Sequence, residues 1–157
     1  MLKIIASLIL IVSLLISVTA CDSNSEVLEN GQNGNSTGVK WLYDWDEALQ
    51  LAQSNNMPIM VNFYTQVCPY CVKLDQYVFA NQEVSDFLND NFICVKSDAG
   101  KSNPASYYYM TGVPTTYFTK PDGTSIGYVP GYVPPETFLM GSQKAFDLWL
   151  NELEGDN

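Results

Sequence analysis

Two cysteines separated by two residues are the feature of this sequence with the clearest chemical meaning. They are Cys68 and Cys71, in the stretch QVCPYCV at residues 66–72. Such a pair could ligate a metal, attach a haem, form a structural disulfide or act as a redox couple. Haem attachment requires a histidine directly after the second cysteine, where this chain has Val72. The chain has no histidine, which also excludes Ser-His-Asp triads, Cys-His dyads and histidine-ligated metals.

A zinc site is also disfavoured by the number of sulfur ligands. Beyond residue 21 the chain offers Cys68, Cys71 and Cys94, one fewer than a four-coordinate structural site needs. A structural disulfide stays open as an alternative, although a loop closed over two residues restricts the unfolded chain little. The spacing therefore favours a redox couple, and we predict no metal and no cofactor beyond a Cys68–Cys71 disulfide.

The redox interpretation requires particular elements on either side of the pair. PIMVNFY, residues 58–64, is apolar apart from Asn62 and predicts a buried central strand. From Pro69 to about Val78 the pattern suits a helix, with proline at its first position. Cys68 would then lie at the helix N-terminus, where free N–H groups and the helix dipole stabilise a thiolate. Cys71 would lie about one turn further on, close enough to attack a mixed disulfide at Cys68.

The remaining segments alternate between strand and helix patterns. Two strands are predicted at 39–42 and 92–97, and two more, at 114–120 and 124–129, form a hairpin around Asp122-Gly123. Helices are predicted at 44–56, 81–89, 103–110 and 135–152. This order predicts an α/β fold in which a central mixed sheet is flanked by helices on both faces.

The N-terminal residues are typical of a segment that targets the protein for export and is not part of the folded domain. Residues 1–21 combine Lys3 with an apolar run of signal-peptide length, and the run ends in Val-Thr-Ala before Cys21. That ending resembles a lipobox, in which Cys21 is lipidated and anchors the protein to a membrane; an ordinary signal peptide cut after Ala20 is the alternative. Residues 22–38 are rich in Asn, Ser and Gly and predict a flexible tether, so the folded domain is expected at 39–157.

The charge balance excludes further classes of partner. The formal net charge is −10, from 17 acidic residues against 7 lysines. Nucleic acids and anionic membrane surfaces attract clustered positive charge, so we expect neither as a ligand of the folded domain.

Four stretches together resemble the thioredoxin family: PIMVNFYTQVCPYCVKLDQYVF, FICVKSDA, GVPTTYFTKPDG and PGYVPPETFL. The similarity covers roughly residues 40–152 and is closest to the lipoprotein and periplasmic branch, which includes the C-terminal domain of DsbD. It implies a three-layer thioredoxin-like fold. It also implies that Pro114 is cis and faces the cysteines, with Val113 contacting the substrate; a proline that merely starts a strand is the alternative.

Three positions depart from the family pattern. Many thioredoxins have a buried aspartate six residues before the first cysteine, where this chain has Asn62, which cannot titrate. Val67 replaces the usual tryptophan. Asp75 lies four residues after Cys71, on the same helical face, and matches an acidic residue of the DsbD domain. We expect Asp75 to take over part of the acid/base role, with a solvated helix charge as the alternative.

A fourth cysteine is harder to place. Counting back from Asp98 puts Cys94 where thioredoxins have a lysine, behind the active site and near Asn62. We expect it to be an inert core cysteine.

The resemblance implies a membrane-anchored, extracytoplasmic thiol–disulfide oxidoreductase, on the periplasmic face of the inner membrane in a Gram-negative cell. Cys68 would attack disulfides of protein substrates and Cys71 would resolve the mixed disulfide. Pro69 and Tyr70 would contact the substrate. We expect a monomeric reductase recharged by a DsbD-like or CcdA-like membrane electron donor. A disulfide oxidase or isomerase, and a non-catalytic binding module on the same fold, are the alternatives.

Overall fold

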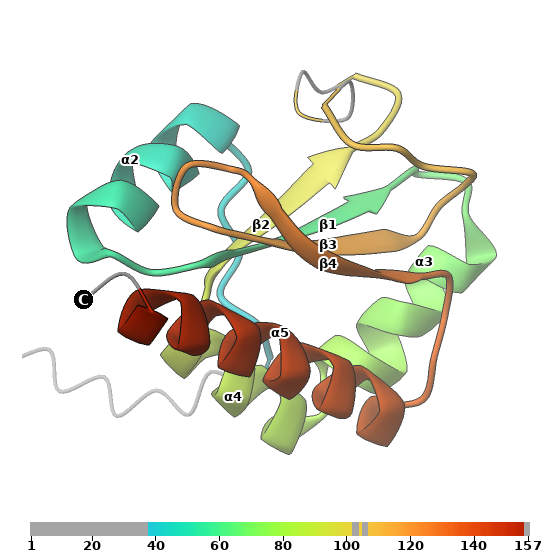
Figure 1. Cartoon of the computed structure of the whole chain (residues 1–157). Helices are drawn as coiled ribbons and strands as arrows, with labels where there is room; N and C mark the ends of the chain where they lie inside the picture. The colour runs from blue at the N-terminus through green and yellow to red at the C-terminus, as the bar shows by residue number, and fades with distance from the viewer. Residues whose placement is uncertain (1–37, 102–103, 105–106, 156–157) are drawn as a thin grey trace, which may run out of the picture. The chain divides into compact units, whose positions relative to one another are not determined.

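A four-stranded mixed sheet organises the folded part of the chain (Figure 1). The computed structural model describes residues 38–101, 104 and 107–155. The strand order is β2-β1-β3-β4, with β1 spanning Ile59–Tyr64, β2 Ile93–Asp98, β3 Thr115–Thr119 and β4 Ser125–Pro130. The β1–β2 pair is parallel, whereas β1–β3 and β3–β4 are antiparallel. The predicted leader, lipobox Cys21 and nearly all of the tether lie outside the described residues.

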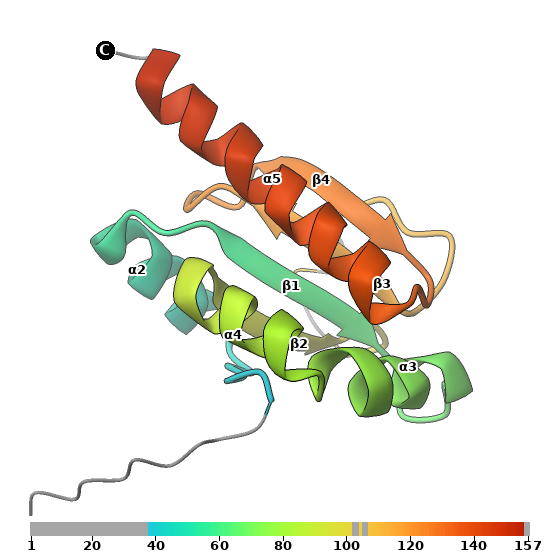
Figure 2. The ribbon, with the colours of Figure 1, turned by 90° about the horizontal axis from the view of Figure 1, so that it is seen from below.

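Helices cover both faces of this sheet, which confirms the predicted three-layer α/β architecture (Figures 1 and 2). Helix α2 packs on one face, and α3, the π-helical turn η1, α4 and α5 pack on the other. Their bounds are Trp45–Asn55 for α2, Pro69–Leu74 for α3, Asp75–Phe79 for η1, Gln82–Asn91 for α4 and Pro135–Gly155 for α5. No helix in the described ranges is both long enough and apolar enough to cross a membrane.

Local signals in the sequence explain where these elements begin. Asp44 caps α2 by accepting a hydrogen bond from the Glu47 N–H at 2.8 Å. Asn81 caps α4 in the same way, accepting from the Val84 N–H at 3.1 Å. β1 is buried along five of its six residues, as its apolar run predicts for a central strand.

The core has two halves, one on each side of the sheet. Successive residues of a strand point to opposite faces, so Met60 and Cys94 face α3, α4 and α5, whereas Val61 and Val95 face α2. Asn62 and Lys96 therefore leave the sheet on the same side as Met60 and Cys94. This is the side on which α3 begins.

Three predicted elements differ in the structure. The strand expected at 39–42 is a single bridge between Leu42 and Val95, because the Lys40 N–H bonds to the Asn89 side chain instead of to a strand. The helix expected from Pro69 to Val78 ends as α3 at Leu74 and continues as η1.

Of the helix expected at 103–110, the described residues keep a 3-10 turn at Pro104, whose carbonyl accepts from the Tyr107 N–H at 3.0 Å; a turn and a bend follow at 107–108, and 109–110 are irregular. Tertiary hydrogen bonds hold this segment. The Tyr108 hydroxyl donates to the Gly123 carbonyl at 2.8 Å, and the Tyr117 hydroxyl donates to the Tyr109 carbonyl. These two bonds tie the segment to β3 and to the turn between β3 and β4.

Candidate active site

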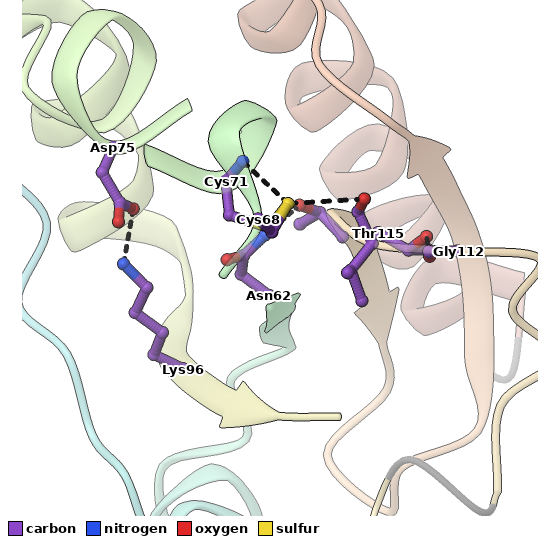
Figure 3. The surroundings of a disulfide bond; sticks show 9 residues. Asn62, Cys68, Cys71, Asp75, Lys96, Gly112 and Thr115 are labelled. Atoms are coloured by element: carbon purple, nitrogen blue, oxygen red, sulfur yellow. Dashed lines mark hydrogen bonds and ion pairs between the residues drawn. A yellow bond between two sulfur atoms is a disulfide. The ribbon is translucent and has the colours of Figure 1, made fainter. Parts of the chain in front are cut away.

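Cys68 and Cys71 are joined by a disulfide at the point where β1 leads into α3 (Figure 3). Cys68 is the N-cap of α3, with φ −92° and ψ 106°, and its Sγ accepts a hydrogen bond from the Cys71 N–H at 3.1 Å. Pro69 occupies the first turn, where its missing N–H leaves no helical bond unmade. A Cys68 thiolate would meet the free N–H groups and positive end of the helix at this position.

The two cysteine residues differ in their exposure to solvent. Cys68 is 9% exposed and Cys71 is 4% exposed, so an attacking group would reach Cys68 more easily. The surface next to Cys68 is apolar: Val67 is 90% exposed and Tyr70 is 62% exposed. These side chains could contact the apolar parts of a bound protein segment.

A loop opposite the disulfide has the geometry that the resemblance implied. The Val113–Pro114 peptide bond is cis, and the Val113 carbonyl oxygen lies 3.6 Å from Cys68 Sγ. The loop is fixed on both sides, because the Gly131 N–H donates to the Pro114 carbonyl at 2.8 Å and the Thr115 hydroxyl donates to the Gly112 carbonyl at 2.7 Å. The Val113 carbonyl is therefore held next to Cys68 by bonds on both sides of the loop.

Asn62 lies in the buried centre of β1 below this site. Asn62 is only 1% exposed, and its side-chain Nδ2 donates a hydrogen bond to the Thr116 hydroxyl at 2.9 Å. In the sheet its direct neighbours are Lys96 on β2 and Thr116 on β3. A neutral amide at this position is satisfied by hydrogen bonds and carries no charge that could titrate.

Asp75 is ion-paired with Lys96, a residue that the sequence analysis did not single out (Figure 3). The Asp75 backbone N–H bonds to the Cys71 and Val72 carbonyls at the junction of α3 and η1. The Asp75 side chain is 40% exposed, whereas the Lys96 side chain is 12% exposed. Asp75 is thus a charge that is both ion-paired and partly exposed to solvent, and its acid/base role stays a prediction.

The expected place of Cys94 near Asn62 is wrong. On the adjacent strands β1 and β2, Cys94 is paired with Met60. The residue paired with Asn62 is Lys96, two positions after Cys94. The Cys94 thiol donates weakly to the Leu88 and Phe92 carbonyls at 3.7 Å each. Cys94 is buried in the core, and burial raises the pKa of its thiol, so it is expected to be chemically inert.

The register of two parallel strands is the signal that could have identified Lys96. Aligning ICVKSD, which starts at Ile93, with IMVNFY places the lysine opposite Asn62, and counting from Asp98 misses this by two residues. Within the described residues, no cluster of three or more His, Cys, Asp or Glu side chains could hold a metal ion.

The comparisons with known proteins agree with this geometry. Residues 45–143 match the model of a family described as a thioredoxin-like domain. A mouse protein named spermatogenesis-associated protein 20 is 32% identical over 110 residues, which are 64% of this chain but 14% of the mouse protein. The chain therefore corresponds to a small part of that relative.

Two solved structures share the fold. A thioredoxin from Thermus thermophilus is 28% identical with a TM-score of 0.61, over 68% of this chain and 86% of that one. The oxidised C-terminal domain of DsbD from Neisseria meningitidis has a TM-score of 0.56 at 18% identity, over 68% of this chain and 99% of that domain. With the family model covering more than half of its residues, and with a Cys-x-x-Cys disulfide facing a cis-proline loop, this chain belongs to the thioredoxin-like domain family.

Proposed function

We propose that this chain is a membrane-anchored, extracytoplasmic thiol–disulfide oxidoreductase that reduces disulfides in protein substrates. One observation supports the proposal most: the Cys68–Cys71 disulfide lies at the N-terminus of α3, and the Sγ of its more exposed residue, Cys68, lies 3.6 Å from the Val113 carbonyl oxygen. Such a pair can alternate between dithiol and disulfide without a further cofactor.

In the reaction, the Cys68 thiolate attacks one sulfur of the substrate disulfide. A mixed disulfide forms, and the other substrate sulfur leaves as a thiolate that takes up a proton. Cys71 then loses its proton and attacks Cys68 Sγ, which releases the second substrate sulfur as a thiol and closes the Cys68–Cys71 disulfide. Two electrons and two protons pass from the cysteine pair to the substrate.

The neighbouring residues are proposed to orient this exchange. Val113, next to Pro114, would offer its backbone to an extended substrate segment beside Cys68. Tyr70 and Pro69 would contact the substrate from the helix side. Asp75 would accept or return the Cys71 proton, directly or through water, while the Asn62 amide keeps the position below the pair uncharged.

The reductase direction requires electrons from outside the chain. Each turnover leaves the pair as a disulfide, so a dithiol of more negative potential must reduce it again. A DsbD-like or CcdA-like membrane carrier would provide this dithiol, and lipidation at Cys21 would hold the domain, as a monomer, near the carrier. Labelling cells with a tagged fatty acid tests the anchor: label on the wild type and none on a Cys21→Ser variant is expected, whereas equal release into the soluble fraction contradicts it.

Trapping and a reduction potential test the reaction itself. Cys71→Ser is expected to accumulate mixed disulfides with substrate proteins, and Cys68→Ser to lose both trapping and insulin reduction, whereas the matched control Cys94→Ser keeps both. A potential near or below about −250 mV would support a reductase. A value above about −150 mV would make the chain an oxidase or isomerase. If Cys68→Ser still binds its partner and the wild type does not reduce insulin, the chain is a binding module.

A further inference from the structure

Lys73 is the one charged residue in the three segments that border Cys68. These segments are residues 65–73, which carry the cysteines, residues 110–115, which carry the cis-proline, and residues 130–135, which lead from β4 into α5. The chain as a whole is acidic, with a formal net charge of −10. The charge that these segments offer to a substrate is therefore opposite in sign to that of the protein as a whole.

The geometry of α3 places Lys73 on the face of the helix that borders the substrate side. Successive residues of an α-helix are about 100° apart, so Lys73 lies in projection between Pro69 and Tyr70, which are both exposed. Lys73 is about 7.5 Å along the helix axis from Cys68. Because helical side chains tilt toward the N-terminus, the Lys73 side chain tilts toward the cysteine end of α3.

An aromatic ring holds the Lys73 ammonium in place. Its Nζ lies 4.6 Å from the ring centre of Tyr132, which is within cation–π distance. Among the residues that the structure describes, no carboxylate forms an ion pair with Lys73. The ring attracts the cation but has no net charge, so the positive charge of Lys73 remains available to a ligand.

The segment that carries Tyr132 is fixed on both sides. The Gly131 N–H donates to the Pro114 carbonyl at 2.8 Å, and Gly131 has φ 71°, a left-handed conformation that glycine adopts without strain. On the other side, the Phe138 N–H donates to the Pro134 carbonyl at 2.9 Å, where α5 begins. This segment passes beside α3 (Figure 1). Tyr132, with the ammonium over its ring, is thus placed next to the cis-proline loop.

The acidic residues closest in sequence to the three segments have other neighbours. Asp75, two residues after Lys73, is ion-paired with Lys96. Glu136, which directly follows residue 135, lines a cavity together with Glu83 of α4. Neither acid therefore cancels the charge of Lys73.

We propose that Lys73 is a specificity-determining residue: held over Tyr132, its ammonium pairs with an Asp or Glu side chain beside the reacting cysteine of the substrate, so that disulfides flanked by acidic residues are preferred. This inference rests on the proposed function in assuming that Cys68 exchanges with substrate disulfides. A free lysine loses side-chain entropy when it forms such a pair, and a lysine already held by a ring loses less. The local pairing opposes the repulsion that the acidic surface exerts on an acidic substrate.

Three synthetic peptides test this selection. They share one sequence with a single internal disulfide and differ only in having Glu, Gln or Lys beside each cysteine. The reduced full chain, in detergent and about 0.15 M salt to screen the long-range field of its surface, is mixed with each peptide, and the rate constant of disulfide reduction is measured. Flanking charges also change the intrinsic reactivity of a disulfide, so each rate constant is divided by that of the same peptide with dithiothreitol.

The readout is the ratio of the normalised rate constants for the Glu and Lys peptides, because a general loss of activity does not change it. For the wild type we expect a ratio of about three, as for an exposed ion pair. Lys73→Met is expected to bring the ratio to about one or below, Lys73→Glu to lower it further, and Tyr132→Leu to lower it in part. Lys144→Met is the matched control, because it removes an exposed lysine of α5 and changes the net charge equally, and it should keep the wild-type ratio.

A wild-type ratio of one or less, or equal changes for Lys73→Met and Lys144→Met, would overturn this inference while the proposed reductase activity stands. If the wild type reduces none of the peptides, the oxidised chain is mixed with the corresponding dithiol peptides. A preference for the Glu peptide in that direction, lost in Lys73→Met, would refute the reductase and leave this inference standing. No exchange in either direction would refute both.

Discussion

Asn62 and Lys96 are direct neighbours across the parallel β1–β2 ladder, yet Lys96 pairs with a carboxylate from the helix side. Asn62 is committed to Thr116, to which its Nδ2 donates. Because the amide carries no charge, Asp75 is the acid that neutralises Lys96. The acidic partner of Lys96 thus comes from the junction of α3 and η1 and not from the neighbouring strand.

Asn62→Asp is expected to make stability depend on pH. The new carboxyl would be almost fully buried, and because Asp75 already neutralises Lys96, desolvation would raise its pKa in the folded state. The folded state then binds the proton more tightly, so the free energy of unfolding is greatest below about pH 4 and falls as pH rises toward the raised pKa. Each unit of pKa rise lowers stability at neutral pH by about 1.4 kcal/mol.

Urea unfolding of Asn62→Asp at about pH 5 and about pH 8 measures this effect. Asn62→Ala is the control, because it removes the hydrogen bond to Thr116 without adding a titrating group. Equal stability of Asn62→Asp at both pH values, relative to this control, would mean that Lys96 has exchanged Asp75 for the new carboxylate.

Most of the fold, and the cysteine pair at the centre of the site, could be predicted from local signals in the sequence. The Cys-x-x-Cys spacing, the apolar run before it and Pro69 identify the disulfide at a helix N-terminus. These signals depend on residues near one another in the chain, and the same holds for the capping residues of α2 and α4. The cis-Pro114 loop opposite the cysteines, by contrast, was expected only from the family resemblance.

The features that were missed depend on contacts between distant segments. Lys96 reaches Asp75 only because β1 and β2 pair in one particular register, and a shift of two residues exchanges Lys96 for Cys94. Residues 107–110 are not helical, because Tyr108 and Tyr117 form hydrogen bonds that the sequence of this segment does not reveal. An apolar helical pattern likewise does not distinguish α3 from the π-helical turn that continues it.

Cys94 is expected to resist alkylation in the folded, reduced protein. Burial raises the pKa of its thiol, and the thiolate is the reactive form. Reaction with iodoacetamide must therefore wait for unfolding, so Cys94 should react about a thousandfold or more slowly than in urea. Mass spectrometry of peptides from timed samples measures this rate, with Cys68 as the internal reference. Native labelling of Cys94 as fast as that of Cys68 would contradict its burial.

Asn89→Ala is expected to loosen the segment that carries Trp41. Asn89 makes two hydrogen bonds to the backbone of Gly38 and Lys40, so the loss should be about 1–2 kcal/mol of unfolding free energy. Asn91→Ala in the same helix is the matched control, because Asn91 donates only one bond of this kind, to the Phe87 carbonyl. Urea unfolding compares the two variants. A loss of unfolding free energy for Asn89→Ala that is equal to or smaller than that for Asn91→Ala would show that the two Asn89 bonds to Gly38 and Lys40 add no stability.

Tyr108 is expected to make the fold sensitive to alkali. Burial raises the pKa of Tyr108 to about 12, and its hydroxyl donates to the Gly123 carbonyl. An exposed tyrosine in the unfolded chain ionises near pH 10, roughly two units lower. The stability that the neutral hydroxyl provides is therefore complete below about pH 10 and is lost as pH rises from about 10 to about 12.

Tyr108→Phe separates this effect from the general loss of stability in alkali. It should lower the free energy of unfolding by about 1 kcal/mol near pH 8, because the Gly123 carbonyl loses its donor. Between about pH 8 and pH 11 it should then lose less stability than the wild type, since the group that ionises on unfolding is gone. Tyr77→Phe, at a tyrosine that is 57% exposed, should follow the wild type throughout. Parallel decline of Tyr108→Phe and wild type in urea titrations at these two pH values would mean that other groups account for the alkaline transition.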